Sequence, residues 1–390
     1  MREQVGREVV IVEAARTPIG RGKRETGYYT DVHPNALLGA TYEAVIERAG
    51  IDPELVENVS AGCVTQVGEQ SQNVARNAWL QAGLPVTTPA STIDMQCGSA
   101  QHAVNIAASQ ISAGTHDIVI GGGVEHMGRV PMGANAAHPE ETGVPFPPEL
   151  LDRYQLIPQG LSAELIAERW EIPRSELDEF GVRSQQLAAR ATDEGRFERE
   201  IVPMSVNGST YVSDQGIRPD TNLETLAKLR PAFKPDGRIT AATSSQISDG
   251  AAAMLLMSRE RAEELGLRPR ARFVDQVTAG VDPVIMLTGP IPATQMILER
   301  NQLTIDDIDL IEINEAFASV VLAWKRELKP DMDRVNVNGG ALALGHPLGS
   351  SGARLITTLL HELERSDREL GLVTMCTAGG TGPATLIQRI

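Results

Sequence analysis

The chain has 390 residues, of which 42% are hydrophobic and 22% are charged, and its formal net charge is −16. Such a length can form two or more domains, or one large α/β unit with a sizeable core. The negative charge argues against nonspecific binding to nucleic acid and against attraction to anionic membranes, because both depend on a positive long-range field. It does not exclude an anionic ligand held by local groups, since salt screens charges beyond about 8 Å.

The sequence carries no sign of a membrane span or of a secretory leader. No apolar run approaches the roughly 20 residues that cross a bilayer, and residues 1–8 lack the apolar stretch of a signal peptide. The chain has three cysteines with no close spacing between any two of them. Free thiols in a reducing compartment fit this pattern, so we expect a cytoplasmic protein.

The first part of the chain alternates predicted strands and helices. Residues 9–12 predict a buried strand, and residues 35–48 carry apolar side chains at helical spacing. Residues 91–93 lead into Cys97, an apolar helix is expected over 100–111, and residues 117–120 predict a strand closed by Gly121–Gly123.

From about residue 124 to residue 244 the sequence becomes rich in proline, glycine and charge, which is typical of an inserted domain. Its clearest helix begins at Ser175, with Asp178 three residues later as a box-like cap. The alternation resumes after residue 248, with helices expected over 292–300, 315–328 and 350–365 and strands over 252–257, 310–313, 335–337, 372–375 and 384–387. We therefore expect one α/β half over residues 1–123 with 245–250, an inserted loop domain over 124–244, and a second half over 251–390.

Two cysteines lie in turns built of small residues, Cys97 before Gly98 and Ser99, and Cys376 before the run 377–382. A sulfur placed after a strand and before a helix lies near unpaired N–H groups, whose field favours a thiolate. A thiolate can attack an acyl carbonyl and hold the acyl group as a thioester. The alternative is an inert buried cysteine, the commoner role of a cysteine in this position.

Two further motifs contribute polar side chains. His346 lies within residues 338–354, a segment rich in glycine, where an imidazole can take a proton from Cys97 and donate to a thioester oxygen. Alone, it could be a surface loop histidine. Asn314 opens the segment 314–317 and could be a helix N-cap; its carboxamide cannot titrate, which suits orientation rather than proton transfer.

These segments in this order resemble the thiolase family, and the resemblance runs nearly from end to end, from residues 13–20 to the last strand. It implies two similar αβα halves that form a five-layered αβαβα core with an inserted loop domain. It also implies that Cys97 is the nucleophile, that Asn314 and His346 form an oxyanion hole for the thioester enolate, and that Cys376 moves the proton at the substrate α-carbon. The N–H groups of Cys97 and Ala378 would form a second oxyanion hole. The family usually has glycine at the position of Ala378, and alanine tolerates a positive φ poorly.

The resemblance implies a coenzyme A site as well. By position, Ser245 would contact the pantetheine arm, Arg218 the nucleotide, and Met286 and Phe317 the acyl end of the pocket. Each has an ordinary alternative as a turn, a solvated charge or a core residue. No dinucleotide or triphosphate motif precedes a helix, so we expect no metal and no tightly bound cofactor, with coenzyme A as a substrate. The family assembles as homodimers or homotetramers, which we expect here.

The function that follows is cleavage of a 3-oxoacyl-CoA by coenzyme A to acetyl-CoA and a shortened acyl-CoA. Residues 62–71 and 96–99 look closer to degradative thiolases that act on steroid-derived CoA esters than to the biosynthetic acetoacetyl-CoA type. A ketoacyl synthase is opposed by the second cysteine and by the segment 314–317. A non-catalytic protein that binds acyl-CoA is the alternative from another class.

Overall fold

The computed structural model describes residues 6–390. Residues 1–5 lie outside the described residues. They are the first part of the segment 1–8, in which we expected no signal peptide. The strands of the first half are β1 (Val9–Arg16), β2 (Gly20–Arg21), β3 (Asn58–Gly62), β4 (Ala90–Ile93), β5 (Ile118–His126) and β8 (Ser248–Ser258). Those of the second half are β9 (Ala271–Gly280), β10 (Leu310–Ile313), β11 (Leu370–Thr374) and β12 (Thr381–Arg389).

The two halves share one sheet in the described part of the chain, with the strand order β10-β11-β12-β9-β1-β8-β5-β3-β4 and with β2 on β8. The strands β3, β4 and β5 are parallel, as are β10 and β11, whereas β8 and β12 run antiparallel to their neighbours. The halves join where β1 meets β9, and this pairing involves only Val10 with Arg272 and Ile11 with Ala271. Each half is therefore a nearly separate sheet that can turn its inner face toward the other.

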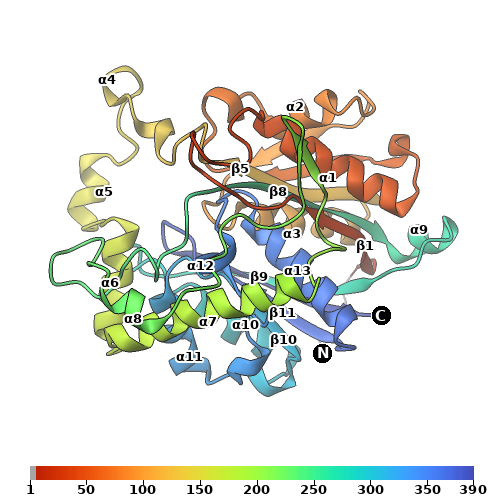
Figure 1. The fold of residues 1–390 in the computed structure, drawn as a ribbon. Helices are drawn as coiled ribbons and strands as arrows, with labels where there is room; N and C mark the ends of the chain where they lie inside the picture. Colours follow the sequence, from red (N-terminus) through yellow and green to blue (C-terminus); the bar gives the residue numbers. More distant parts are fainter. Residues whose placement is uncertain (1–5) are drawn as a thin grey trace.

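Two helices fill the space between these inner faces. They are α3 (Ser99–Ser112) and α13 (Ser351–Arg365), and nearly all of α13 is buried. Their apolar side chains pack with those of both half-sheets in one core cluster. Outside the first half lie α1 (Pro34–Ala49) and α2 (Val74–Gln81), and outside the second lie α10 (Pro290–Asn301) and α11 (Ala318–Leu328). The result is the expected five-layered αβαβα arrangement, which can be followed from top to bottom in Figure 1.

The segment between β5 and β8 wraps around this core. It holds α4 (Pro139–Thr142), α5 (Pro148–Arg153), α6 (Gln159–Arg169), α7 (Arg174–Asp193) and α8 (Leu223–Ala227), with a hairpin of β6 (Met204–Val206) and β7 (Ser209–Tyr211). Figure 1 shows α4 and α5 standing out from the body while α7 runs along it. Of the two remaining α-helices in the described chain, α9 (Arg259–Glu264) follows β8 and α12 (Ala341–Leu344) precedes the His346 loop.

Several local expectations were wrong. The strand predicted over 117–120 runs on through Gly121–Gly123 to His126, because these glycines let it approach α3 and the loop at Gly349: a Cβ on Gly123 would lie 2.0 Å from the Gly349 carbonyl oxygen. Helix α7 has no side-chain cap, and Asp178 accepts instead from Arg174 at 2.8 Å. Residues 335–337 form a single bridge at Val335 rather than a strand.

The expected domain limits cut through two strands. Residue 124 lies inside β5, and residue 251 lies inside β8, which pairs with β1 and β5 of the first half. A strand flanked on both sides by partners of one half belongs to that half. We therefore propose that the inserted segment runs from about residue 127 to residue 247, and that the second half begins after Ser258.

Candidate active site

The nucleophile candidate, Cys97, follows β4 at a sharp turn. Gln96 before it has a φ of 51°, an unfavourable conformation for a side-chain-bearing residue, and Asp94 stabilises this turn by accepting from the N–H of Gln96 at 2.7 Å. Helix α3 begins two residues later, at Ser99. The turn aims the sulfur of Cys97 at the layer between the halves, where it lines a cavity of about 320 Å³.

The environment of Cys97 does not favour the thiolate, contrary to our expectation. Burial raises the pKa of the thiol to about 11, although the backbone N–H groups of Ala378 and of Cys97 itself face the sulfur and act in the opposite direction. The loss of hydration raises the pKa by more than the N–H groups lower it. Their dipoles offset only part of the free energy needed to place a charged sulfur in the protein interior. The resting group is therefore a thiol, and it needs a base.

His346 can supply that base. It lines the same cavity as Cys97, and burial, assisted by the positive charge of Arg354, lowers its pKa to about 3, so the imidazole is neutral at physiological pH. Ser351 donates to the Pro347 carbonyl at 2.8 Å and lies 2.6 Å from Nδ1 of His346. The serine oxygen thus accepts from Nδ1–H, and in this tautomer Nε2 is the unprotonated nitrogen, which accepts from the Asn314 amide at 3.3 Å and can take a proton in its place.

Asn314 lies against the other ring nitrogen. Its Nδ2 is 3.3 Å from His346 Nε2, whereas its Oδ1 is buried with no hydrogen-bond partner among the described residues. Helix α11 starts only at Ala318, so Asn314 is not a helix cap. A buried, unsatisfied carboxamide oxygen beside an imidazole suits a site that is completed by a ligand or a water molecule.

Cys376 follows β11 and is fully buried. Burial raises the pKa of its thiol, and the electrostatic effect of Cys97 raises it further. Cys376 does not line the cavity itself. It is therefore a buried thiol just outside the cavity lining, within the electrostatic influence of Cys97.

Ala378 presents its N–H toward the sulfur of Cys97. Its φ is not positive; the next two residues, Gly379 and Gly380, each take a φ of 80°. The turn thus meets its need for left-handed backbone at the glycines, and the alanine is compatible with the donor geometry.

The loop that carries His346 is attached to the first half by two contacts. Ser248 at the start of β8 accepts from the N–H of His346 at 3.1 Å. Glu125 at the end of β5 accepts from the N–H of Gly349 and of Val64, both at 2.9 Å. Sequence reasoning missed both residues; the position of Glu125 just after the three glycines of β5 was the available signal.

The four residues expected to bind coenzyme A lie in three different surroundings: the cavity wall, the core and the surface. Ser245 and Phe317 line the cavity, and the N–H of Ser245 donates to the Ala316 carbonyl at 2.9 Å. Met286 lies in the core while its neighbour Leu287 lines the cavity. Arg218 is exposed, and its side chain does not reach the cavity wall. The roles of all four stay predictions.

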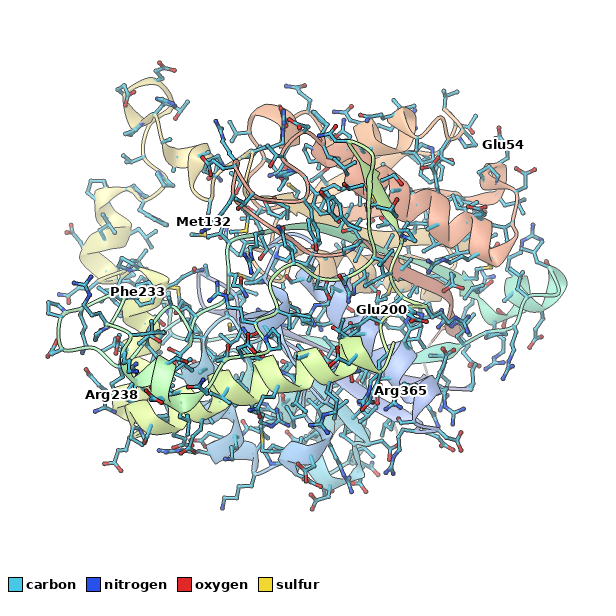
Figure 2. The ribbon with its side chains drawn as sticks, in the orientation of Figure 1. Glu54, Met132, Glu200, Phe233, Arg238 and Arg365 are labelled. Carbon is cyan, nitrogen blue, oxygen red and sulfur yellow. The ribbon has the colours of Figure 1, made fainter. Side chains whose placement is uncertain are left out.

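The cavity wall also includes residues that sequence reasoning did not single out. They are mostly apolar, and they include Met127, Met132, Phe233, Ile247 and Leu348. Met132 and Phe233 are 53% and 41% exposed, so they form the mouth of the cavity; Figure 2 labels both beside the projecting α4–α5 segment. Phe233 packs edge-on against Phe317, with ring centroids 5.8 Å apart.

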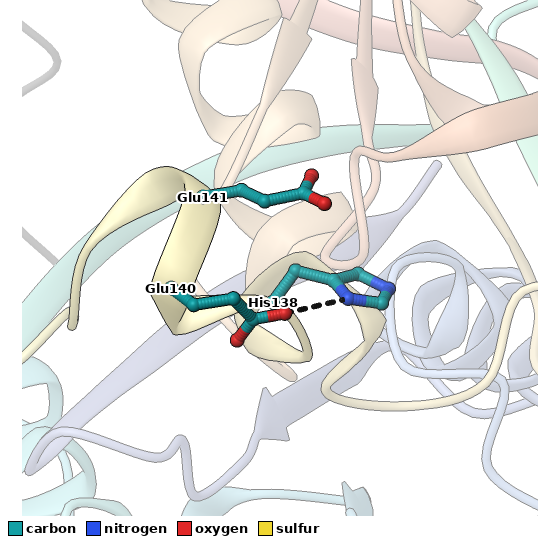
Figure 3. Close-up of side chains that lie close together, drawn as sticks. All are labelled: His138, Glu140 and Glu141. Carbon is teal, nitrogen blue, oxygen red and sulfur yellow. Dashed lines mark hydrogen bonds and ion pairs between the residues drawn. The ribbon is translucent and has the colours of Figure 1, made fainter.

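Within the described residues, one group of potential metal ligands lies close together: His138, Glu140 and Glu141 (Figure 3). All are exposed and come from one short segment at α4, with His138 Nδ1 3.4 Å from Glu140. Exposed acidic groups are common without a metal, so we assign none here. No described helix combines the length and the apolar character needed to cross a membrane.

Comparison with known proteins agrees with this geometry. The N-terminal domain model of thiolases matches residues 9–260 and the C-terminal domain model matches residues 267–389. The chain therefore belongs to the thiolase family, whose members are acyltransferases.

Curated relatives of similar length include a steroid 3-ketoacyl-CoA thiolase (FadA6) of Mycobacterium tuberculosis, which is 44% identical over 100% of this chain and 96% of its own length. A 3-ketoacyl-CoA thiolase of Marinobacter nauticus is 46% identical over 98% and 99%. Among solved structures, the acetyl-CoA acetyltransferase of Bacillus anthracis superposes with a TM-score of 0.92 at 39% identity and covers all of both chains.

Proposed function

We propose that this protein cleaves 3-oxoacyl-CoA esters with coenzyme A, giving acetyl-CoA and an acyl-CoA shortened by two carbons. The observation that carries the proposal is the convergence of two thiols and a neutral imidazole from segments far apart in sequence. Cys97 and His346 line one cavity, and Cys376 is buried outside that lining, within the electrostatic influence of Cys97.

In the first half-reaction, Nε2 of His346 takes the proton of Cys97, and the sulfur attacks the 3-oxo carbon. The N–H groups of Cys97 and Ala378 stabilise the oxyanion of the adduct. The bond between C2 and C3 then breaks, and its electron pair forms the enolate of acetyl-CoA. Protonated His346, with Asn314, stabilises the enolate oxygen, and Cys376 delivers a proton to C2.

In the second half-reaction, coenzyme A enters and gives its thiol proton to the Cys376 thiolate. The sulfur of coenzyme A attacks the acyl-Cys97 thioester, and Cys97 leaves as a thiolate that recovers its proton from His346. Both cysteines end protonated, and one thioester has replaced another. This acyl exchange between thiols is close to balanced in free energy, and each step of the sequence is reversible, so the same groups can also catalyse the condensation.

We propose a degradative role and a large apolar acyl group. The apolar cavity wall with an exposed mouth at Met132 and Phe233 supports this, as do the names of the steroid and 3-ketoacyl-CoA thiolases among the relatives. The similarity to an acetyl-CoA acetyltransferase favours the biosynthetic acetoacetyl-CoA reaction as the second candidate. The two differ in the ratio of activities on long and short 3-oxoacyl-CoA esters.

We further propose a homodimer or homotetramer in the cytoplasm. The edge strand β4 is only partly buried, and an edge strand offers unpaired N–H and C=O groups to a second chain. The free cysteines are consistent with a reducing compartment.

The test is an assay of the cleavage of acetoacetyl-CoA and of a long-chain 3-oxoacyl-CoA. The readout is the loss of the enolate absorbance of the substrate. Cys97→Ser and Cys376→Ser should each abolish cleavage, whereas Cys63→Ser, at the third buried cysteine, should retain it. Iodoacetamide followed by peptide mapping should modify Cys97 first, and acyl substrate should protect it. Tight acyl-CoA binding without turnover by the unmodified protein would instead establish the non-catalytic alternative.

A further inference from the structure

A second cavity, of about 430 Å³, lies at the far end of the molecule from α4 and α5, close to the C-terminal end in Figure 1. It is formed by β1, the end of α1, the segment after α7 that holds Arg199, the loop before β9, the end of α13 and the end of β12. Its lining residues with charged side chains are Arg48, Arg199, Arg268, Arg270, Arg389, Glu13 and Glu364. Five arginines thus meet two carboxylates in a chain whose net charge is −16.

The two carboxylates are already used by a single arginine. Arg270 donates to Glu364 through Nε at 2.8 Å and through Nη2 at 2.6 Å, and its Nη1 contacts Glu13. Glu13 is 3.9 Å from Arg199, too far for a hydrogen bond. Neither carboxylate therefore makes a hydrogen-bonded ion pair with any of the other four guanidinium groups.

Three of these other arginines have no close carboxylate. Arg48 donates to the carbonyl oxygens of Arg199 and Ile201, at 2.7 and 2.9 Å. Arg268 is exposed and has no hydrogen-bond or ion-pair partner among the described residues. Arg199 is largely exposed, with the distant Glu13 as its only ion-pair partner in the described chain. Arg389 differs, because it pairs with Asp367 at 2.7 Å.

The crowding of positive charge affects the titration of Arg48. Burial lowers the pKa of Arg48, and the neighbouring Arg199 and Arg270 lower it further, although Glu13 acts in the opposite direction. Guanidinium groups in a concave site attract anions, and their planar donors suit the oxygens of phosphate. Apolar side chains, including Val12 and Leu267, form other parts of the wall.

We propose that this cavity is a binding site for a small molecule that carries a diphosphate or polyphosphate group, with Arg199 and Arg268 as the donors that an anion would engage. Such a group would face the guanidinium groups that lack a carboxylate. The cavity is larger than one phosphate, and its apolar residues would accept the organic part of a nucleoside diphosphate. It shares no residue with the cavity at Cys97, so occupation would not require the catalytic groups.

The site also joins the two halves. Glu13 and Arg48 belong to the first half, whereas Arg270, Glu364 and Arg389 belong to the second, and β1 and β9 meet beside them through only two residue pairs. An anion bound to Arg199 of the inserted segment and to Arg268 of the second half would tie these two segments together beside the junction. Its binding should therefore raise the temperature of unfolding, since a ligand that binds only the folded state stabilises it.

The experiment is isothermal titration of the full-length protein with inorganic pyrophosphate and, separately, with ADP, at constant ionic strength. The expected result is saturable binding with a dissociation constant of about 1 mM or tighter, together with a saturable increase in melting temperature. Binding of pyrophosphate alone would identify an inorganic ligand, and binding of ADP alone would identify a nucleotide; either outcome supports the site.

The specific variant is Arg199→Ala with Arg268→Ala, two exposed positions whose loss should leave the fold intact. It should weaken binding at least tenfold. The matched control, Lys23→Ala with Arg153→Ala, removes the same charge from exposed positions outside the cavity and should bind as the unmodified protein does. Cleavage of 3-oxoacyl-CoA should be unchanged in both variants. Absence of saturable binding, equal loss in both variants, or full binding by the Arg199/Arg268 variant would each overturn the proposal.

Discussion

The carboxylate of Glu125 accepts a hydrogen bond from the backbone N–H of Gly349 at 2.9 Å, and this contact crosses from one half of the molecule to the other. Glu125 is the penultimate residue of β5 in the first half, and Gly349 lies three residues after His346. The same carboxylate accepts from the N–H groups of Val64 and Thr65 at 2.9 and 3.1 Å. One buried carboxylate therefore sets the position of the imidazole loop relative to the half that carries Cys97.

Glu125→Gln should impair both stability and cleavage. An amide group in place of Oε1 would face two donors, the N–H of Thr65 and Nε2 of Gln70. An unsatisfied buried group of this kind costs about 1–3 kcal/mol, and displacement of the His346 loop should lower kcat roughly tenfold to a hundredfold. Glu54→Gln, at an exposed carboxylate, is the control for denaturant unfolding and for steady-state kinetics. Unchanged kcat in Glu125→Gln would show that the loop is positioned by other contacts.

A second prediction concerns the pH dependence of stability. Burial raises the pKa of Glu312 to about 8, although Arg354 acts in the opposite direction. The folded state then holds this proton more tightly than the unfolded state, so the associated stability is present below about pH 4.5 and is lost as the pH rises through about 8. In Glu312→Gln this loss cannot occur.

The measurement is thermal unfolding of the unmodified protein and of Glu312→Gln between roughly pH 5 and pH 9. The melting temperature of the variant should rise relative to that of the unmodified protein across this range. Glu54→Gln should show a constant difference from the unmodified protein. A difference between Glu312→Gln and the unmodified protein that does not change with pH would mean that Glu312 stays ionised in the folded state.

The third prediction concerns the cavity mouth. Phe233 is 41% exposed beside the apolar cavity, and an acyl group that covers it would remove this surface from water. Phe233→Ala should therefore reduce kcat/KM for a long 3-oxoacyl-CoA by roughly tenfold while changing it little for acetoacetyl-CoA. Leu80→Ala, at a similarly exposed position on α2, should change neither. Equal losses on both substrates would place the acyl group elsewhere.

The candidate catalytic residues could be proposed from the sequence because each lies in a short segment of unusual composition at an element end. Periodicity predicted α1, α3, α10 and α13 within one or two residues, since their apolar faces are regular. It could not predict Glu125 or Ser248, because their importance comes from contacts with a loop more than 90 positions away. It also could not predict that burial of Cys97 would outweigh the nearby N–H groups, a balance set by packing on all sides.

Ala378 provides the last prediction, because its position separates the role of its N–H from the role of its side chain. Its φ is not positive, and the glycines after it supply the left-handed backbone. Ala378→Gly should therefore keep cleavage within a few-fold of the unmodified rate. Ala378→Pro removes the N–H that faces Cys97 and should lower kcat by roughly 10²–10³-fold, as loss of one oxyanion-hole donor does. Burst acylation of Cys97 should slow in parallel, because the lost donor acts on the adduct at this sulfur. Comparable unfolding curves for the two variants would exclude a collapsed turn as the cause, and equal rates would mean that this N–H takes no part in catalysis.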